Sequence, residues 1–242
     1  MNIVINKRVV RAGAVLLAGL LLCAACQTQP PVQSGVSTPA RSPAPPLPVA
    51  AAHYRIRGAE SHLRILVFKG GPLAQFGHNH VITAGKIQGD VYLTPDIHKA
   101  GFHLTVPVQS LVVDPPAARK EEGGDFASSP SPEAVAGTRK NMLGPKVLDA
   151  QRYPDIDIRS VAVTGPDWAP DITVRITLHG VSRDLTVPVS LQHGDGRVTA
   201  TGVFKLNQSD FGITPFAVMG GGLQVQDTVR IRFRITAVKA GT

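Results

Sequence analysis

The sequence predicts an all-β protein: an extended antiparallel barrel of about eight strands, with one short helical segment in a long loop. Two adjacent stretches, Ile172–Leu178 and Leu185–Leu191, alternate apolar and polar residues, which is the period of a strand with one buried face. The 20 prolines and 24 glycines suit a chain with many turns. A sheet of this size with one apolar face must close or stack, because a single helix covers too little of it.

Strands are expected along most of the chain after residue 53. They are His53–Arg57, His62–Phe68, Gly85–Thr94, Phe102–Val113, Ile156–Val163, Ile172–Leu178, Leu185–Leu191, Arg197–Leu206 and Asp227–Val238. The six-residue segment His179–Asp184 is expected to join two of them, with Gly180 in the turn. Pro107 and Pro188 each remove a ladder donor, so each is expected at an edge or a bulge.

The pattern breaks in the middle of the chain. Val112–Pro132 contains adjacent prolines, adjacent glycines and a Ser/Pro run, and these features are typical of a mobile loop. Pro132–Asp149 is predicted to be helical for about three turns, because Glu133 stands in the first turn, where the helix dipole favours an anion. Gly144 and Pro145 are expected to end or interrupt this helix.

Residues 1–25 are typical of an export signal rather than of the fold. Lys7, Arg8 and Arg11 form a basic start, and a small, apolar run follows them. That run is too short to anchor the chain by spanning a bilayer. We therefore expect this segment to direct the chain to the bacterial envelope.

The residues before Cys26 resemble the bacterial lipoprotein processing site, in which the cysteine becomes the first mature residue and carries acyl chains. A plain secretory signal cut near Ala25 is the alternative, and it predicts a protein released into the periplasm. Residues 26–52 have the Pro-, Ser- and Ala-rich composition of a disordered tether, which leaves 53–242 as the barrel domain. Gln27 after the cysteine favours a periplasm-facing lipoprotein in the outer rather than the inner membrane.

Composition and motifs exclude several function classes. The net charge of +8 falls to +5 without the three basic residues of the signal, and no dense basic cluster with aromatics indicates nucleic-acid binding. Both cysteines lie in the N-terminal segment, so no thiol chemistry is expected in the mature domain. No Gly-x-Ser-x-Gly elbow occurs, and Asp155 and Asp157 alternate with isoleucines as on a wet strand face. No enzyme activity and no cofactor are predicted.

Several segments occur in an order that resembles the YceI-like family. They are Glu60–His62, Met142–Ser160, Thr177–Val189 (Thr-Leu-His-Gly-Val-Ser-Arg-Asp-Leu-Thr-Val-Pro-Val), Leu206–Ile213 (Leu-Asn-Gln-Ser-Asp-Phe-Gly-Ile) and Asp227–Ile231. The resemblance spans about His53–Val238, which is essentially the whole domain. The chain departs from the usual family pattern at Gly70–His80, and the loop Val112–Pro132 is long.

The resemblance implies a lipocalin-like barrel in a secreted or periplasmic protein that holds a polyisoprenoid or similar amphiphilic lipid along its axis. The expected partners are this lipid and, through the acyl anchor, a membrane. The alternative is an envelope stress or interaction protein with a side-chain-filled barrel that acts through its surface loops, by way of protein partners that the sequence does not identify.

Ten apolar residues that are expected to face inward are candidate lipid-binding residues of a tunnel. They are Phe68, Leu104, Val106, Leu178, Val187, Phe204, Leu206, Phe211, Ile231 and Phe233. His78 and His80 are candidate headgroup or loop contacts. A polar turn with Asn79 in the left-handed conformation, or metal binding by the two histidines, are alternative interpretations. No metal site and no catalytic residue are assigned.

Overall fold

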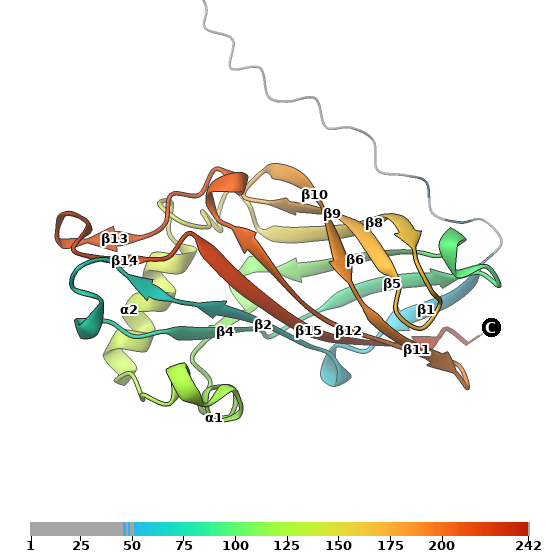
Figure 1. The fold of residues 1–242 in the computed structure, drawn as a ribbon, viewed down its shortest axis with the longest axis horizontal. Helices are drawn as coiled ribbons and strands as arrows, with labels where there is room; N and C mark the ends of the chain where they lie inside the picture. The colour runs from blue at the N-terminus through green and yellow to red at the C-terminus, as the bar shows by residue number, and fades with distance from the viewer. Residues whose placement is uncertain (1–45, 47, 49–50, 242) are drawn as a thin grey trace, which may run out of the picture. The chain divides into compact units, whose positions relative to one another are not determined.

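The computed structural model describes residues 46, 48 and 51–241, which all belong to one unit, Arg41–Thr242. The predicted export signal, Cys26 and most of the predicted tether lie outside the described residues. The described part is mostly β-structure with two α-helices and seven short 3₁₀ turns (Figure 1). None of its helices has the length and apolar character needed to cross a bilayer.

The elements follow one another in a largely sequential order. The strands are β1 Ala52–Ile56, β2 His62–Val67, β3 Lys69–Gly70, β4 His80–Ala84, β5 Gln88–Leu93, β6 Gly101–Pro107, β7 Leu111–Val113, β8 Asp155–Thr164, β9 Asp171–Leu178, β10 Val181–Pro188, β11 Ser190–Gly194, β12 Arg197–Asn207, β13 Ala217–Val218, β14 Leu223–Val225 and β15 Thr228–Lys239. The helices are α1 Pro116–Glu122 and α2 Pro132–Leu143, and the 3₁₀ turns are η1 Gly58–Glu60, η2 Ala74–Phe76, η3 Ile97–Lys99, η4 Val108–Ser110, η5 Gly124–Phe126, η6 Ser209–Phe211 and η7 Met219–Gly221.

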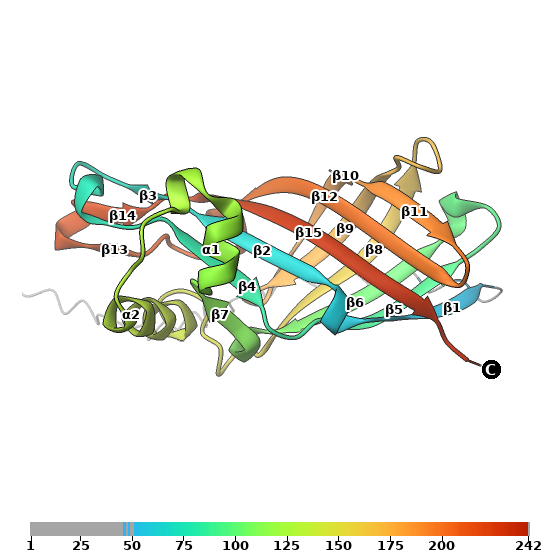
Figure 2. The ribbon, with the colours of Figure 1, turned by 90° about the horizontal axis from the view of Figure 1, so that it is seen from below.

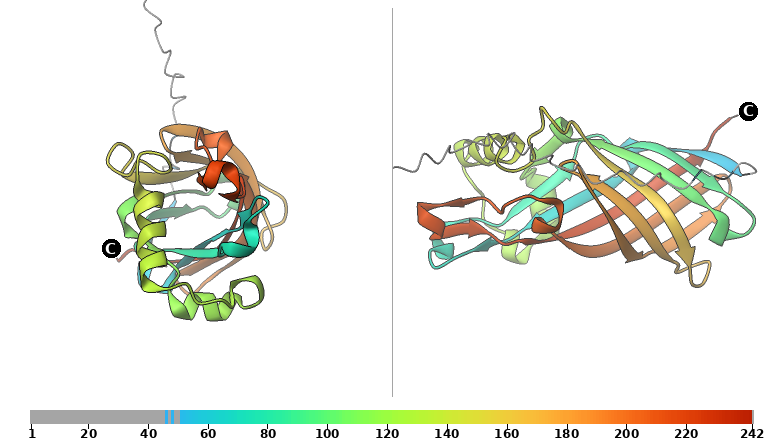
Figure 3. Two further views of the ribbon diagram at one scale, coloured as in Figure 1. Left: turned by 90° about the vertical axis from the view of Figure 1, so that its left-hand side faces the viewer. Right: turned by 90° about the horizontal axis from the view of Figure 1, so that it is seen from above.

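The main sheet returns on itself and forms a barrel. Its antiparallel order runs β10-β9-β8-β6-β5-β1-β15, and β15 also pairs with β12, which pairs with β11. Only Val189 separates β10 from β11, so the two form one long strand that bonds β9 with its first part and β12 with its second. The backbone N–H groups of Val189 and Leu191 donate to the carbonyls of Pro170 and Trp168 and carry the ladder across this junction. The end-on view shows the resulting ring of strands (Figure 3, left).

Three more long strands of the barrel are interrupted and therefore consist of two strands each: β1 with β2, β4 with β5, and β6 with β7. β1 and β2 together pair with β5 and β4, and β5 and β4 together pair with β6 and β7. Counted with each interrupted strand as one, the described barrel has eight long strands in meander order, with β15 closing on β1 and β2. The predicted barrel of about eight strands is therefore confirmed.

The connection between the two strands that first indicate β-structure differs from the prediction. The turn contains only His179 and Gly180, both with positive φ, as in a two-residue type I′ hairpin. The segment expected to be a linker belongs to β10, because Arg175 and Asp184 form a cross-strand ion pair and hold it in register. Pro188 ends β10, at the break that the sequence predicts for it.

The loop predicted for Val112–Pro132 is not a plain loop, since α1 and η5 lie within it. α2 begins with Ser131 as the N-cap and ends at Gly144, as predicted for the single helix. β4 is an additional strand that the pattern analysis does not identify. α1 lies beside β2 and β4 on the outside of the barrel (Figure 2).

Candidate functional site: an apolar tunnel through the barrel

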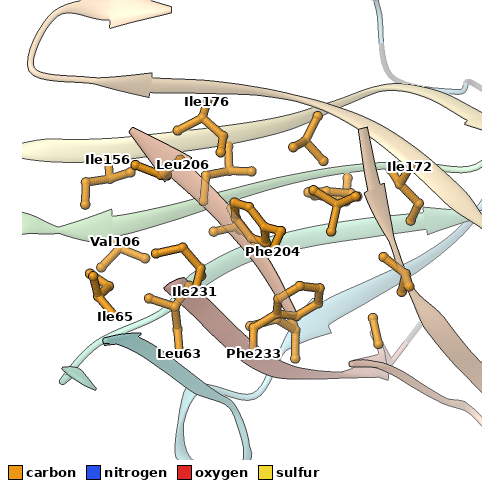
Figure 4. Close-up of a pocket in the computed structure, with 18 of the residues that line it drawn as sticks. Leu63, Ile65, Val106, Ile156, Ile172, Ile176, Phe204, Leu206, Ile231 and Phe233 are labelled. Atoms are coloured by element: carbon orange, nitrogen blue, oxygen red, sulfur yellow. The ribbon is translucent and has the colours of Figure 1, made fainter. Parts of the chain in front are cut away.

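Alternate side chains of the long strands point into the barrel. On β9 these are Ile172, Val174, Ile176 and Leu178, and on β15 they are Val229, Ile231, Phe233 and Ile235. The arrangement follows from the period of two along a strand, since every second residue faces the same side of the sheet. Figure 4 shows labelled inward side chains of several strands, among them Ile176, Phe204 and Ile231, pointing toward the same space.

These side chains do not fill the barrel and leave an apolar cavity of about 260 Å³. The cavity extends along the barrel, because Met142, Val147 and Leu148 contribute to its wall beside α2, and Ile97 and Pro170 contribute at the opposite end. Of the described residues that line it, only Gln208 has a polar side chain, and its Nε2 donates to the carbonyl of Gln226 at 2.9 Å. The tunnel therefore offers an elongated ligand almost no hydrogen bonds.

The size of this space has an energetic consequence. An apolar wall that faces an open space buries less of its surface than a filled core would, and each CH₂ group removed from water contributes about 0.8 kcal/mol. Water gains few hydrogen bonds against an apolar wall and compensates poorly. The barrel would therefore gain substantially from an apolar molecule that filled the tunnel.

Eight of the ten candidate lining residues line the cavity. They are Leu104, Val106, Leu178, Val187, Phe204, Leu206, Ile231 and Phe233. The wall also contains residues that the sequence analysis did not select, among them Leu63, Ile65, Ile156, Ile172 and Ile176. These lie at alternate positions of predicted strands, so the period of two could have identified them. Their role as lipid contacts stays a prediction.

Phe68 is not part of the tunnel wall. It packs outside the barrel with Leu66, Val81, Ala118 and Phe126, and its ring meets that of Phe126 edge-on at 5.5 Å between centroids. The reason is that Phe68 follows β2 on the side of Leu66, opposite to the inward residues Leu63 and Ile65, and α1 and η5 cover this end of the outer face. The assignment of Phe68 to the tunnel was therefore wrong.

Phe211 is also absent from the tunnel wall, although only 1% of its surface is exposed. It belongs to η6, which lies against both β10 and β12 where these strands are not paired with each other. Its ring is part of the barrel's main apolar core. Phe211 therefore packs between β10 and β12 rather than lining the tunnel as predicted.

His80 belongs to a buried polar network outside the barrel rather than to the tunnel. Its Nδ1 lies 2.6 Å from Asp114 Oδ2, and Arg119 donates to Asp114 Oδ1 at 2.5 Å and to the carbonyl of Asn79 at 2.8 Å. Burial would raise the pKa of Asp114, but hydrogen bonds from His80, the backbone of Val81 and Arg119 outweigh it and hold this pKa below its ordinary value. The network joins β4 to α1.

His78 is exposed, and Asn79 is not in the left-handed conformation. The side chain of Asn79 accepts from the backbone N–H of Lys69 at 3.0 Å and donates to the carbonyl of Asp125 at 3.0 Å. Asn79 thus fastens the loop by its side chain rather than by a left-handed turn. Among the residues that the structure describes, no group of three or more His, Cys, Asp or Glu side chains is arranged to hold a metal ion.

Two solved structures share the fold. Burkholderia cenocepacia BcnA matches with a TM-score of 0.56 at 19% identity, over 76% of this chain and 99% of that one. A polyisoprenoid binding domain from Saccharophagus degradans, implicated in plant cell wall breakdown, matches with a TM-score of 0.53 at 12% identity, over 78% of this chain and 99% of that one.

Among curated proteins, none matches the chain. The sequence model of the YceI-like domain matches residues 54–237, which is most of the chain and all of the barrel apart from the ends of β1 and β15. The chain therefore belongs to the YceI-like domain family.

Proposed function

We propose that this protein binds a polyisoprenoid or a similar long-chain lipid in the barrel tunnel and that it is not an enzyme. The observation that carries the proposal is the apolar cavity of about 260 Å³ along the barrel. The similar domain from Saccharophagus degradans is described as polyisoprenoid binding, which supports the same ligand class here.

The chemistry of the wall favours a hydrocarbon chain over a polar ligand. Each methylene group that moves from water into an apolar site contributes about 0.8 kcal/mol. A polar group that lost its water without a new hydrogen bond would cost about 1–3 kcal/mol, and beside Gln208 the described wall has no polar side chain to compensate it. The alternative of an interaction protein with a side-chain-filled barrel fits this wall less well, because the inward side chains leave the tunnel open.

A filling variant tests the proposal. In Ala200→Phe, a ring on β12 projects into the tunnel, and in the control Lys205→Phe a ring on the same strand lies on the exposed outer face. Native mass spectrometry and solvent extraction of gently purified protein should give a bound lipid for the natural chain and the control, and much less for Ala200→Phe. A homogeneous ligand-free mass for the natural chain, together with no uptake of quinone or prenol probes, would contradict the proposal.

We further propose, from the sequence alone, that the domain faces the periplasm as a lipoprotein. Cys26 would carry the acyl chains and residues 26–52 would serve as the tether, with the outer membrane as the expected site. Cells fed labelled palmitate should label the natural chain but not Cys26→Ser. If the natural chain were unlabelled and began near residue 26 in the periplasmic fraction, the secretory alternative would hold.

A further inference from the structure

A second cavity, of about 690 Å³, lies on the outer wall of the barrel. We call it the outer groove. Its walls come from β2, β12 and β15, which lie side by side (Figure 2), together with the residues just before β9 and at the junction of β10 and β11. Its lining includes cationic side chains and exposed apolar side chains, and these two groups favour the same class of ligand.

The cationic side comes from cross-strand neighbours on β2 and β15. Arg232 stands opposite Arg64, and Arg234 stands opposite His62. Like charges opposite each other destabilise a sheet. The carboxylate of Glu122 lies between Arg64 and Arg232, with Oε1 2.9 Å from the guanidinium of Arg64 and Oε2 3.2 Å from that of Arg232, and it offsets the repulsion between the two arginines.

Arg234 has no such partner, since no carboxylate of the described chain lies within ion-pair distance of it. It is exposed, and it faces the groove beside His62. Arg234 is therefore the cation of the groove that an anion could pair with, whereas His62 beside it already lies near the carboxylate of Glu121.

The apolar side of the groove is unusually exposed. Six large apolar side chains are exposed in the described part of the chain, and two of them, Trp168 (73%) and Val203 (48%), line this groove. A tryptophan beside arginines is typical of surfaces that lie at the boundary between water and lipid headgroups.

The groove also borders the tunnel. Val189 and Phe233 line both spaces, so the wall between them is one side chain thick. This thin region lies where β12 has no pairing with β10, and Gly202 leaves room for the Phe233 ring, which would be 2.7 Å from a Cβ at that position. A lipid whose head occupied the groove would thus have its chains next to the tunnel, a link that rests on the proposed function.

We propose that the outer groove docks on an anionic lipid surface and takes a phosphate-bearing headgroup at the Arg234–His62 end, with Trp168 and Val203 against the acyl boundary. The proposal commits to a lipid headgroup because a free phosphate would use the cations but leave the exposed apolar half of the groove unused. Phe76 and Met219, which are exposed on the loops beyond β3 and β13, are the competing contact surface.

The chain contains one tryptophan, so the fluorescence of Trp168 reports directly on the groove. The full-length protein in its Cys26→Ser form, which lacks the proposed acyl anchor, should show a blue-shifted emission with vesicles of phosphatidylcholine and phosphatidylglycerol, and quenching when the lipid chains are brominated. Vesicles of phosphatidylcholine alone should give little change. Inorganic phosphate should compete only weakly.

Substitutions at one position then test the charge. Arg234→Gln should weaken partitioning to the anionic vesicles about fivefold, because one arginine near an anionic surface contributes about 1 kcal/mol. Arg234→Lys should retain most of the binding, and Arg183→Gln, an exposed arginine on β10 outside the groove, should leave it unchanged.

Three results would overturn the proposal: equal binding to neutral vesicles, vesicle binding without a change in Trp168 fluorescence, or binding of inorganic phosphate as tight as that of the vesicles. The second would assign the contact to another surface, such as that of Phe76 and Met219. Extraction of the tunnel lipid from the same Arg234→Gln sample keeps the two proposals apart, since the tunnel ligand should be retained whether or not the groove docks.

Discussion

Asp114 links two elements, the strand β4 and the helix α1. Its carboxylate, with 1% of the side chain exposed, bonds His80 on β4, the backbone N–H of Val81 and the guanidinium of Arg119 on α1. A buried ion pair is not in itself strongly stabilising, but removal of one partner leaves the other charge buried without compensation. Asp114 therefore supplies the counter-charge for Arg119, while hydrogen bonds from Arg119 to Asn79 and Ser128 also hold α1.

Asp114→Asn should lower the free energy of unfolding by about 3 kcal/mol, because it leaves the guanidinium of Arg119 buried without a counter-charge. The matched control is Asp155→Asn, an exposed aspartate of β8, which should change stability by less than about 0.5 kcal/mol. Urea denaturation of the three proteins measures both effects. A loss for Asp114→Asn no larger than that of the control would show that the ion pair contributes nothing.

The pKa values of Asp114 and Asp157 predict how stability depends on pH. Burial would raise each pKa, but hydrogen bonds, from His80, Val81 and Arg119 in one case and from Arg159 and His103 in the other, lower both below the ordinary value of 3.8. The unfolded chain therefore binds protons first, so the stability from these groups is present above pH 3.8 and is lost as the pH falls below it. Unfolding followed by circular dichroism from neutral to acid pH should show this loss, and Asp114→Asn should show less of it.

The strands show how far periodicity alone leads. On β9, β12 and β15 only one face is apolar, and the inward residues Ile176, Phe204 and Ile231 follow from the sequence. On β2, Leu63 and Ile65 face inward and Arg64 faces outward, so the period of two places Phe68 on the outer face, and its assignment to the tunnel did not follow that period. What the local pattern does not contain is the cover for this apolar outer end, because α1 and η5 lie about fifty residues away in the chain.

α1 was missed for a related reason. Pro115, Pro116, Gly123 and Gly124 appear in the sequence to break secondary structure, but the structure uses them to bound a helix. Pro116 occupies the first turn, where its missing N–H is harmless, and Gly123 ends the helix with φ of 56°. Breaker residues seven positions apart are thus compatible with a short helix, and tertiary contacts to β4 decide between helix and loop.

The β9–β10 hairpin provides a prediction at the scale of an element. Gly180 has φ of +76°, and a Cβ there would lie 2.5 Å from the ring of Tyr153. Gly180→Ala should therefore destabilise the protein by about 1–3 kcal/mol, through backbone strain and displacement of that ring. In the control, Gly137→Ala, the new Cβ meets nothing within 4 Å inside α2, so stability should rise by up to about 1 kcal/mol. Thermal unfolding should show a lower melting temperature for Gly180→Ala and an equal or higher one for Gly137→Ala. An unchanged melting temperature for Gly180→Ala would mean that the turn accommodates the methyl group without strain.

At the scale of the whole molecule, the barrel combines the two surfaces for which we propose a lipid ligand. The tunnel wall is apolar along its length, and the outer groove places cations and an exposed tryptophan on the far side of Val189 and Phe233. Closure of the sheet is what makes both possible, because the junction of β10 and β11 completes the tunnel and also leaves β10 and β12 unpaired beside the groove. The junction of β10 and β11 thus shapes the barrel, the tunnel and the outer groove.

Removal of the tunnel ligand should lower the stability of the whole domain. A ligand present at about 100 times its dissociation constant adds about 2.7 kcal/mol to the free energy of unfolding, which corresponds to roughly 5–10 °C for a domain of this size. Protein stripped of lipid by denaturation and refolding should therefore melt that much lower than gently purified protein, and added lipid should restore the difference. Ala200→Phe should melt at nearly the same temperature before and after stripping, because its ring occupies part of the space that the lipid would fill. If stripped and unstripped natural protein melted together, the tunnel would have to be closed by its own side chains in solution.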